Sequence, residues 1–249
     1  TGSATATAVY NNSTGTITVT TGPVTGGSAA AIVGIRNAAA GTINVPTVVG
    51  GGNATAYGIL NSTTGPVNVT GDLTKMTAVP ISNASTGLIT LSGAANQTVN
   101  FGGPIIGVVV NKSVSGDVTW TSGDAIAFGA AWTMVNLTIP AGVTLDSSVT
   151  GNYALTLSGA FTQSSTTSKF LARASTITVN GDGAVTLDGT ADSTQYNSAT
   201  LVLNGDNTLT YNNLTTPTLN GFANVTTAAG KTLTLAKSLA VGTALSLGG

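Results

Sequence analysis

The chain has 249 residues, of which 6% are charged: seven are Lys or Arg, eight are Asp, and Glu, His and Cys do not occur. Without His or Cys, the sequence excludes Ser-His and Cys-His nucleophilic catalysis, the usual zinc and haem sites, and a disulfide framework. A net charge of −1 offers no basic surface to a nucleic acid.

Apolar residues make up 41% of the chain, which is enough for a hydrophobic core. They occur in short runs, far below the roughly 18 consecutive apolar residues of a transmembrane helix, so we expect no membrane insertion. The sequence shows no leader at Thr1 and is interpreted as a processed, mature chain. Abundant Thr, Gly and Asn favour β-strands joined by tight turns.

One pattern occurs four times near the N-terminus, at nearly equal spacings. Each copy has a central Asn, a branched aliphatic residue two positions before it, a Gly four positions after it, and further aliphatic residues six and eight positions after it. The central residues are Asn11, Asn37, Asn61 and Asn83; the preceding aliphatics are Val9, Ile35, Ile59 and Ile81; the glycines are Gly15, Gly41, Gly65 and Gly87. Successive central Asn residues are 26, 24 and 22 positions apart. A repeat period of about 24 residues is typical of a repeat architecture.

Residues 96–150 are less regular, and they contain the apolar run IIGVVV at 105–110 and both tryptophans. This segment is open to three interpretations: irregular coils, an outward loop, or a second small β-unit. Beyond it, TITVNGD at 176–182 is matched one period later by TLVLNGD at 200–206, and Val185 and Leu187 fall on Leu209 and Tyr211. A further step of the same length leads to Leu233 and Leu235.

We call the four N-terminal copies the first array and the C-terminal copies the second array. Both arrays consist of short strands with alternating apolar residues, separated by Gly and Asn, with no helical stretch between them. Such strands bury their apolar faces when successive copies stack. The sequence therefore predicts an all-β fold, a parallel β-solenoid of about 24 residues per coil, expected to be a right-handed β-helix. We expect residues 1–249 to form a single continuous domain.

Two positions keep the same residue in all four copies: the central Asn (the Asn column) and the Gly four positions after it (the Gly column). Both are predicted to have structural roles. An inward Asn side chain can bond to the peptide groups of its own turn and of the neighbouring coil, which satisfies buried polar groups. The Gly that follows it in each copy is predicted to occupy a turn with a positive φ angle.

The segments AYGILNSTTG at 56–65, VNV at 67–69 and TLVLNGD at 200–206 resemble the repeats of bacterial β-helical surface proteins, including autotransporter passengers and large adhesins, and those of phage tail fibres. The resemblance implies a fibrous or surface-displayed role, outside the cell or on a virion. It carries no catalytic residues.

Three kinds of site can be formulated from the residues. Asp182, Asp188 and Asp192 form the only cluster of acids, which could serve a polysaccharide-active enzyme or hold Ca²⁺; solvated turn carboxylates are the alternative. Otherwise we expect no cofactor. Trp120, Phe128 and Trp132 could form a platform for a sugar or a partner, or could fill a wide part of the core.

Asn-x-Ser/Thr sequons are frequent and are either glycan acceptors or a by-product of composition, and an Asn of an inward ladder could not carry a glycan. The candidate acceptors are Asn53, Asn61, Asn68, Asn96, Asn111, Asn136, Asn213 and Asn224, besides Asn11, Asn12 and Asn83 in the first array.

The repeat pattern continues to the last residues with no charged cap, and sparse charge removes the repulsion that keeps proteins monomeric. The sequence therefore predicts a non-catalytic, extracellular structural protein: a subunit or segment of a fibre, sheath or surface layer that assembles with copies of itself. The alternatives are an adhesin or phage receptor-binding fibre that recognises surface carbohydrate, with its site around residues 101–134, and a β-helix enzyme that acts on polysaccharides.

Overall fold

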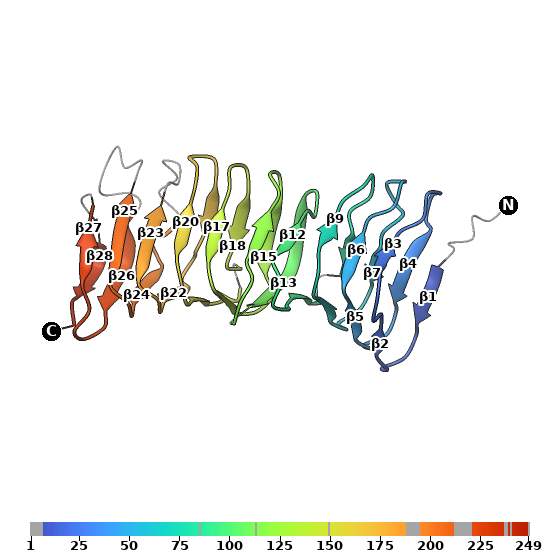
Figure 1. Ribbon diagram of the computed structural model, residues 1–249, viewed down its shortest axis with the longest axis horizontal. Helices are drawn as coiled ribbons and strands as arrows, with labels where there is room; N and C mark the ends of the chain where they lie inside the picture. Colours follow the sequence, from blue (N-terminus) through green and yellow to red (C-terminus); the bar gives the residue numbers. More distant parts are fainter. Residues whose placement is uncertain are drawn as a thin grey trace.

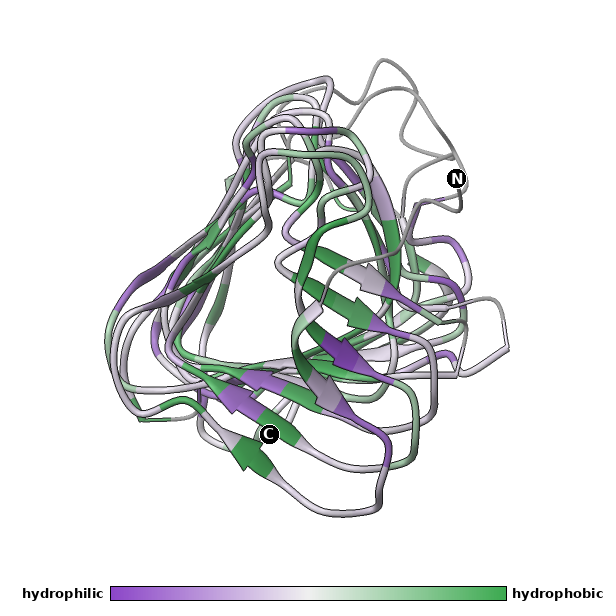
Figure 2. Cartoon of the chain, turned by 90° about the vertical axis from the view of Figure 1, so that its right-hand side faces the viewer, coloured by the Kyte–Doolittle hydropathy of each residue, from purple (hydrophilic) through white to green (hydrophobic). Residues whose placement is uncertain are grey.

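The computed structural model describes residues 7–84, 86–112, 114–148, 150–187, 195–211, 221–236, 239 and 241–248. These residues are all-β and form a parallel β-solenoid of about nine turns, with about 24 residues per coil. The coils stack into a rod with β1 at one end and β28 at the other (Figure 1). Seen along the rod, they superpose into a three-sided tube (Figure 2). The predicted fold class is confirmed.

The strands follow one another around three faces of the tube. The first face comprises β1 (Thr7–Asn11), β4 (Val33–Asn37), β7 (Ile59–Asn61), β10 (Ile81–Asn83), β15 (Ala125–Phe128), β18 (Thr144–Asp146) and β21 (Lys169–Leu171). The second comprises β2 (Ile17–Thr18), β5 (Ile43–Val45), β8 (Val67–Val69), β11 (Ile89–Leu91), β13 (Pro104–Lys112), β16 (Trp132–Met134), β19 (Leu155–Leu157), β22 (Thr176–Val179), β24 (Thr200–Leu203), β26 (Phe222–Thr227) and β28 (Val241–Ser246). The third comprises β3 (Pro23–Thr25), β6 (Thr47–Val49), β9 (Leu73–Thr74), β12 (Gln97–Val99), β14 (Val118–Trp120), β17 (Leu137–Ile139), β20 (Phe161–Gln163), β23 (Gly183–Leu187), β25 (Asn207–Tyr211) and β27 (Leu233–Leu235).

The aliphatic columns predicted for the first array are confirmed by the strand register. Val9 pairs with Ile35, Ile35 with Ile59, and Ile59 with Ile81. Ile35, Ile59 and Ile81 are 1% exposed or less. Each coil thus covers the apolar side chains of the previous one, and this burial is the main favourable term in the stability of the rod.

The Asn column forms a ladder of side-chain hydrogen bonds. The Nδ2 atoms of Asn11, Asn37 and Asn61 each donate to the Oδ1 atom of the next Asn, at 3.1, 3.2 and 2.8 Å. Each of these amides also donates to the carbonyl of the column Gly in its own turn. The predicted contact within the turn is confirmed, whereas the bond between these coils joins side chains rather than a side chain and a peptide group.

The predicted role of the Gly column was wrong. None of its four glycines has a positive φ angle. Gly41, Gly65 and Gly87 are required because the chain passes too close to its neighbours, whereas a Cβ atom on Gly15 would meet only the Ser13 Oγ atom at 3.2 Å. A Cβ atom on Gly65 would lie 2.6 Å from the Asn37 Nδ2 atom and would also overlap the Gly41 carbonyl oxygen. The column gives the Asn ladder room to approach the backbone.

Gly65→Ala is therefore expected to destabilise the rod by about 2–3 kcal/mol, because backbone and ladder must shift to admit the methyl group. The matched control is Gly52→Ala, whose Cβ would make only ordinary contacts, the nearest at 3.5 Å from the Ser28 Cα atom. Urea unfolding of both variants measures the difference. A Gly65→Ala midpoint equal to that of Gly52→Ala would show that the close approach has no energetic weight.

In the second array, the register of two coils is confirmed and that of the third differs from the prediction. Ile177 pairs with Leu201, and Val185 pairs with Leu209. In the next coil Leu209 pairs with Leu235, not with Leu233, so this step is longer than the predicted period by two positions. Since side chains alternate with a period of two, such a slip keeps the apolar side chains on the same face.

The middle segment consists of irregular coils rather than an outward loop or a separate unit. The strand β13 is nine residues long, shifts register between Ile105 and Val108, and pairs successively with β15, β11 and β16. Through β13, the second face is hydrogen-bonded without interruption from β2 to β28. The other two faces are interrupted here, between β10 and β13 and between β14 and β17.

Candidate functional site

The three aromatic residues considered as a binding platform lie in the core. Trp120, Phe128 and Trp132 are at most 3% exposed. The rings of Phe128 and Trp132 stack with centroids 3.7 Å apart, and those of Trp120 and Trp132 with centroids 5.5 Å apart. The Trp132 Nε1 atom donates to the Val108 carbonyl at 2.8 Å. Their ring faces are thus occupied by one another, in agreement with the core-filling interpretation.

The aromatic stack continues along the tube into the C-terminal half, which the sequence did not indicate. Phe170 contacts Phe128, Phe161 and Tyr196 at centroid distances of 5.9, 5.9 and 6.1 Å, and Tyr196 contacts Phe222 at 4.9 Å. The Tyr196 hydroxyl donates to the buried Gln163 Oε1 atom at 2.7 Å. A sequence signal was present only as isolated aromatic residues at unequal spacings.

Of the three acids in the predicted cluster, the structure places only Asp182, since Asp188 and Asp192 lie outside the described residues. Asp182 is next to Asp206, and the Lys231 Nζ atom lies 3.5 Å from a carboxylate oxygen of each. The two carboxylates raise the pKa of the Lys231 ammonium. Among the described residues, no group of three or more acids could hold a metal ion. A cation of the chain itself, the Lys231 ammonium, lies between these two carboxylates and offsets one of their two charges.

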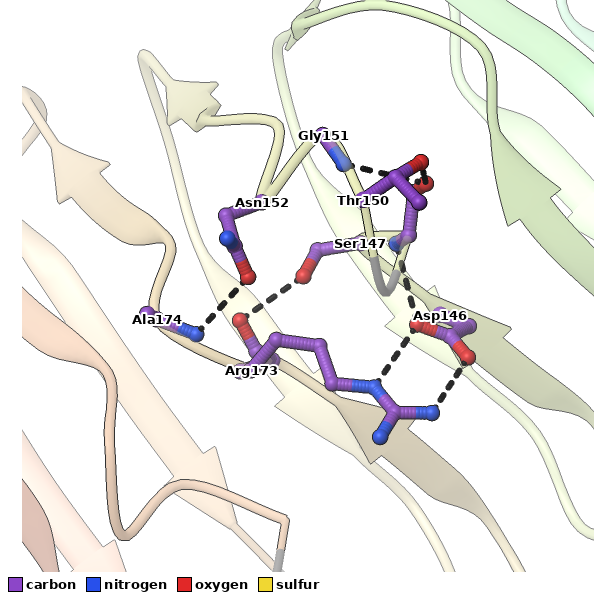
Figure 3. Close-up of polar contacts among 9 residues, drawn as sticks. Asp146, Ser147, Thr150, Gly151, Asn152, Arg173 and Ala174 are labelled. Carbon is purple, nitrogen blue, oxygen red and sulfur yellow. Dashed lines mark hydrogen bonds and ion pairs between the residues drawn. The ribbon is translucent and has the colours of Figure 1, made fainter.

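The most extensively bonded ion pair joins Asp146 and Arg173 on neighbouring coils. The Arg173 Nε and Nη2 atoms donate to the two carboxylate oxygens of Asp146 at 3.1 and 2.8 Å (Figure 3). The hydrogen bond to Asp146 is the main cause that raises the pKa of the guanidinium. Ser147, next to Asp146, donates to the Ala172 carbonyl at 2.7 Å. These bonds fix the turn between two coils, which is a structural role.

Two buried charged residues lie in the middle segment, and neither has a salt-bridge partner in the described part of the chain. Lys112 donates from Nζ to the carbonyls of Gly93 and Ala95 at 3.0 and 2.6 Å, and burial lowers the pKa of its ammonium group. Asp124 accepts from the Phe101 and Gly102 amides, and burial raises the pKa of its carboxyl group. Sequence reasoning missed both residues, because nothing in the pattern distinguishes them from exposed turn residues.

The same segment contains two places where neighbouring coils are not joined by a strand ladder. We call them the first-face seam, between β10 and β13, and the third-face seam, between β14 and β17. A proline stands at each: Pro104 begins β13, and Pro140 follows β17. Proline lacks the amide hydrogen that a ladder needs. The coil from Val118 to Leu137 is also shorter than the average coil. Both signals were visible in the sequence.

A groove of about 320 Å³ lies along the third-face seam, lined by Asp117, Val118, Thr119, Trp120, Asn136, Thr138 and Pro140. Side-chain bonds replace the ladder at one end of this groove. The Asn136 amide and Nδ2 group donate to the Asp117 Oδ1 atom at 3.2 and 3.3 Å, and the Ala160 amide donates to the Asn136 Oδ1 atom at 2.9 Å. The first-face seam has a smaller cavity of about 160 Å³. The third-face groove is the candidate functional site.

The sequons fall into different environments. The Asn61 side chain is 1% exposed and lies inside the ladder, so it cannot carry a glycan. Asn96 and Asn111 are exposed. Asn53, Asn68, Asn136 and Asn224 are partly exposed, and Asn213 lies outside the described residues. Of the candidates in the first array, Asn12 is exposed, Asn83 is partly exposed and Asn11 is buried. The exposed candidate acceptors are thus Asn12, Asn96 and Asn111.

By its geometry the chain is a β-solenoid whose buried polar groups serve the stacking of the coils. Comparisons with protein-family models, curated proteins and solved structures find no match to the chain. The described residues include no helix long and apolar enough to cross a membrane. Function is therefore inferred from the geometry of the rod.

Proposed function

We propose that the chain is a non-catalytic structural protein, a segment of an extracellular fibre, sheath or surface layer that assembles end to end with copies of itself. The observation that carries this proposal is the distribution of exposed apolar side chains. Of the eight large hydrophobic residues exposed among the described residues, five lie at the two ends of the rod. They are Val9 and Tyr10 on β1, Leu235 on β27, and Leu245 and Leu247 on or just after β28.

Val9 and Leu245 continue the columns of the core, whereas Tyr10 pairs with Arg36 on the outer side of β1. Val9 is 40% exposed, although its register partner Ile35 is buried, and Leu245 is 50% exposed, although its partner Val225 is buried. Each therefore occupies an inward position that a further coil would cover. Among the described strands, the end strands β1, β2, β27 and β28 each pair with a single neighbour, so one main-chain edge of each is a template for another parallel strand.

All coils run in the same direction, so the two ends of the rod differ. One end can pair with the other end of a second copy in the same way that each coil pairs with the next coil. Association of β28 of one copy with β2 of the next is then heterologous, and repetition of this contact produces an open filament. Only 6% of the residues are charged, so electrostatic repulsion between copies is weak.

Leu245→Asp is expected to reduce the mean filament length at least tenfold, because it places a charge in the apolar contact between rods. Met76→Asp is the matched control: Met76 is also exposed, just after β9 rather than at an end, so this variant should assemble like the unchanged protein. Negative-stain imaging and sedimentation measure the length. Assembly should change little between low and high salt, since few charges take part.

Three outcomes would overturn the proposal. The unchanged chain could form only single short rods at all concentrations, Leu245→Asp could assemble normally, or filament length could fall steeply with added salt. If only single short rods form, the alternative of a rod that displays a carbohydrate-binding site is favoured. If filament length falls steeply with salt, the contact between rods is electrostatic rather than apolar.

A further inference from the structure

The width of the third-face seam limits what can occupy it. Paired strands lie about 4.8 Å apart, and an inserted strand would require about twice that distance. The strands β14 and β17 have no ladder, yet they approach with Cα atoms within 8 Å of each other. An opening of this width is too narrow for an additional peptide strand. A single layer of small polar groups fits it.

The main-chain groups of the seam require a partner that both donates and accepts. Among the described strands, β14 bonds only to β12, and β17 bonds only to β20, so one edge of each strand faces the seam without a ladder partner. Main-chain edges present amide N–H groups and carbonyl oxygens in alternation. A hydroxyl group serves both, whereas an ammonium group only donates and a carboxylate only accepts.

The side chains along the groove favour a neutral ligand. Thr119 and Thr138 are exposed and offer hydroxyl and methyl groups from the two strands. Of the described residues that line the groove, Asp117 alone is charged, and none is Lys or Arg. The Asp117 carboxylate repels an anionic ligand, although the Lys112 ammonium, outside the lining, attracts this carboxylate.

We propose that the third-face seam is a binding site for a neutral saccharide, with sugar hydroxyls between β14 and β17 and the sugar ring against the Thr methyl groups and Pro140. The groove volume of about 320 Å³ is at the lower end of ligand pockets, which limits the bound part to one or two sugar rings. This site does not depend on end-to-end assembly, and it lies at the side of the rod.

The test uses the whole chain and a panel of probes: uncharged oligosaccharides of glucose, mannose, galactose and N-acetylglucosamine, together with sialylated and sulfated oligosaccharides. The unchanged protein should bind at least one uncharged probe and none of the acidic ones. The Thr119→Val/Thr138→Val variant keeps the shape of the groove but removes its two hydroxyls, and it should bind that probe at least tenfold more weakly. Thr162→Val/Thr186→Val is the matched control, because these residues are on the same face where β20 and β23 are paired.

A second measurement on the unchanged protein guards against a variant that fails to fold. The bound probe should slow amide hydrogen exchange in residues 118–120 and 137–139, and not in 161–163. The proposal is overturned if no uncharged probe binds, if acidic probes bind better, if both double variants lose binding equally, or if exchange at the seam is unchanged.

Discussion

Trp132→Ala is expected to destabilise the protein more than any other single truncation, by about 3–5 kcal/mol. Trp132 is fully buried, and its ring stacks on both Phe128 and Trp120. The substitution removes these contacts, leaves a cavity between coils, and removes one of the two donors to the Val108 carbonyl, which keeps its bond from the Gly129 amide. The rod interior is continuous, so neighbouring coils cannot collapse into the space without shifting their strand register.

Tyr10→Ala is the control, since Tyr10 is an aromatic residue on β1 that is 55% exposed. Its loss should cost less than about 1 kcal/mol, mainly through the contact with the Arg36 guanidinium. Denaturant titration followed by circular dichroism gives both values. If Trp132→Ala unfolds at nearly the same denaturant concentration as Tyr10→Ala, the aromatic column does not support the middle of the rod.

Asn61→Ala is expected to be the second most costly change, at about 3–5 kcal/mol. The Asn61 Nδ2 group donates to the Gly65 carbonyl and to the Asn83 Oδ1 atom, both at 2.8 Å, and its Oδ1 atom accepts from Asn37 at 3.2 Å. Truncation removes a hydrogen-bond partner from three groups in and around the core, of which the Asn37 Nδ2 group keeps its bond to the Gly41 carbonyl. Each unpaired buried group costs about 1–3 kcal/mol, and a small cavity adds to this.

Asn68→Ala provides the comparison in the same coil. Asn68 faces outward, is partly exposed, and makes one side-chain bond, from Nδ2 to the Asn44 Oδ1 atom at 2.8 Å. Water can replace that bond, so its loss should cost about 1 kcal/mol or less. Equal unfolding free energies for the two variants would contradict the view that the inward ladder, rather than amide content in general, stabilises the stack.

The parts of the fold that the sequence predicted are those in which one residue type recurs at one period. The Asn ladder and the columns of Ile35, Ile59 and Ile81 are of this kind, because a repeated environment selects a repeated side chain. The step from Leu209 to Leu235 was missed because extra residues lie between otherwise similar coils, and pattern matching at a constant period cannot detect them. The role of Gly65 was missed because a close approach depends on neighbouring coils.

The candidate site was the least predictable part of the molecule. The third-face seam arises from the absence of a ladder between β14 and β17 in the described structure, and an absent interaction leaves no repeated residue type. Two local signals remain, the short coil between Val118 and Leu137 and the proline at 140, and they have a physical meaning only when the strands on both sides have been located. The burial of Lys112 and Asp124 follows from the same local irregularity and could not be inferred from their neighbours in sequence.

Oxidative cross-linking of double-cysteine variants tests the stacking of the coils most directly, because the natural chain has no Cys. Thr162 pairs with Thr186, and Asn44 pairs with Asn68, in the two halves of the rod. Register partners lie about 4.8 Å apart, within the range that a disulfide spans, whereas Thr162 and Ala184 are about 8 Å apart and outside it. We expect Thr162→Cys/Thr186→Cys and Asn44→Cys/Asn68→Cys to form intramolecular disulfides, and Thr162→Cys/Ala184→Cys to remain reduced. No disulfide in either register pair, or equal yields in all three variants, would contradict the β-solenoid.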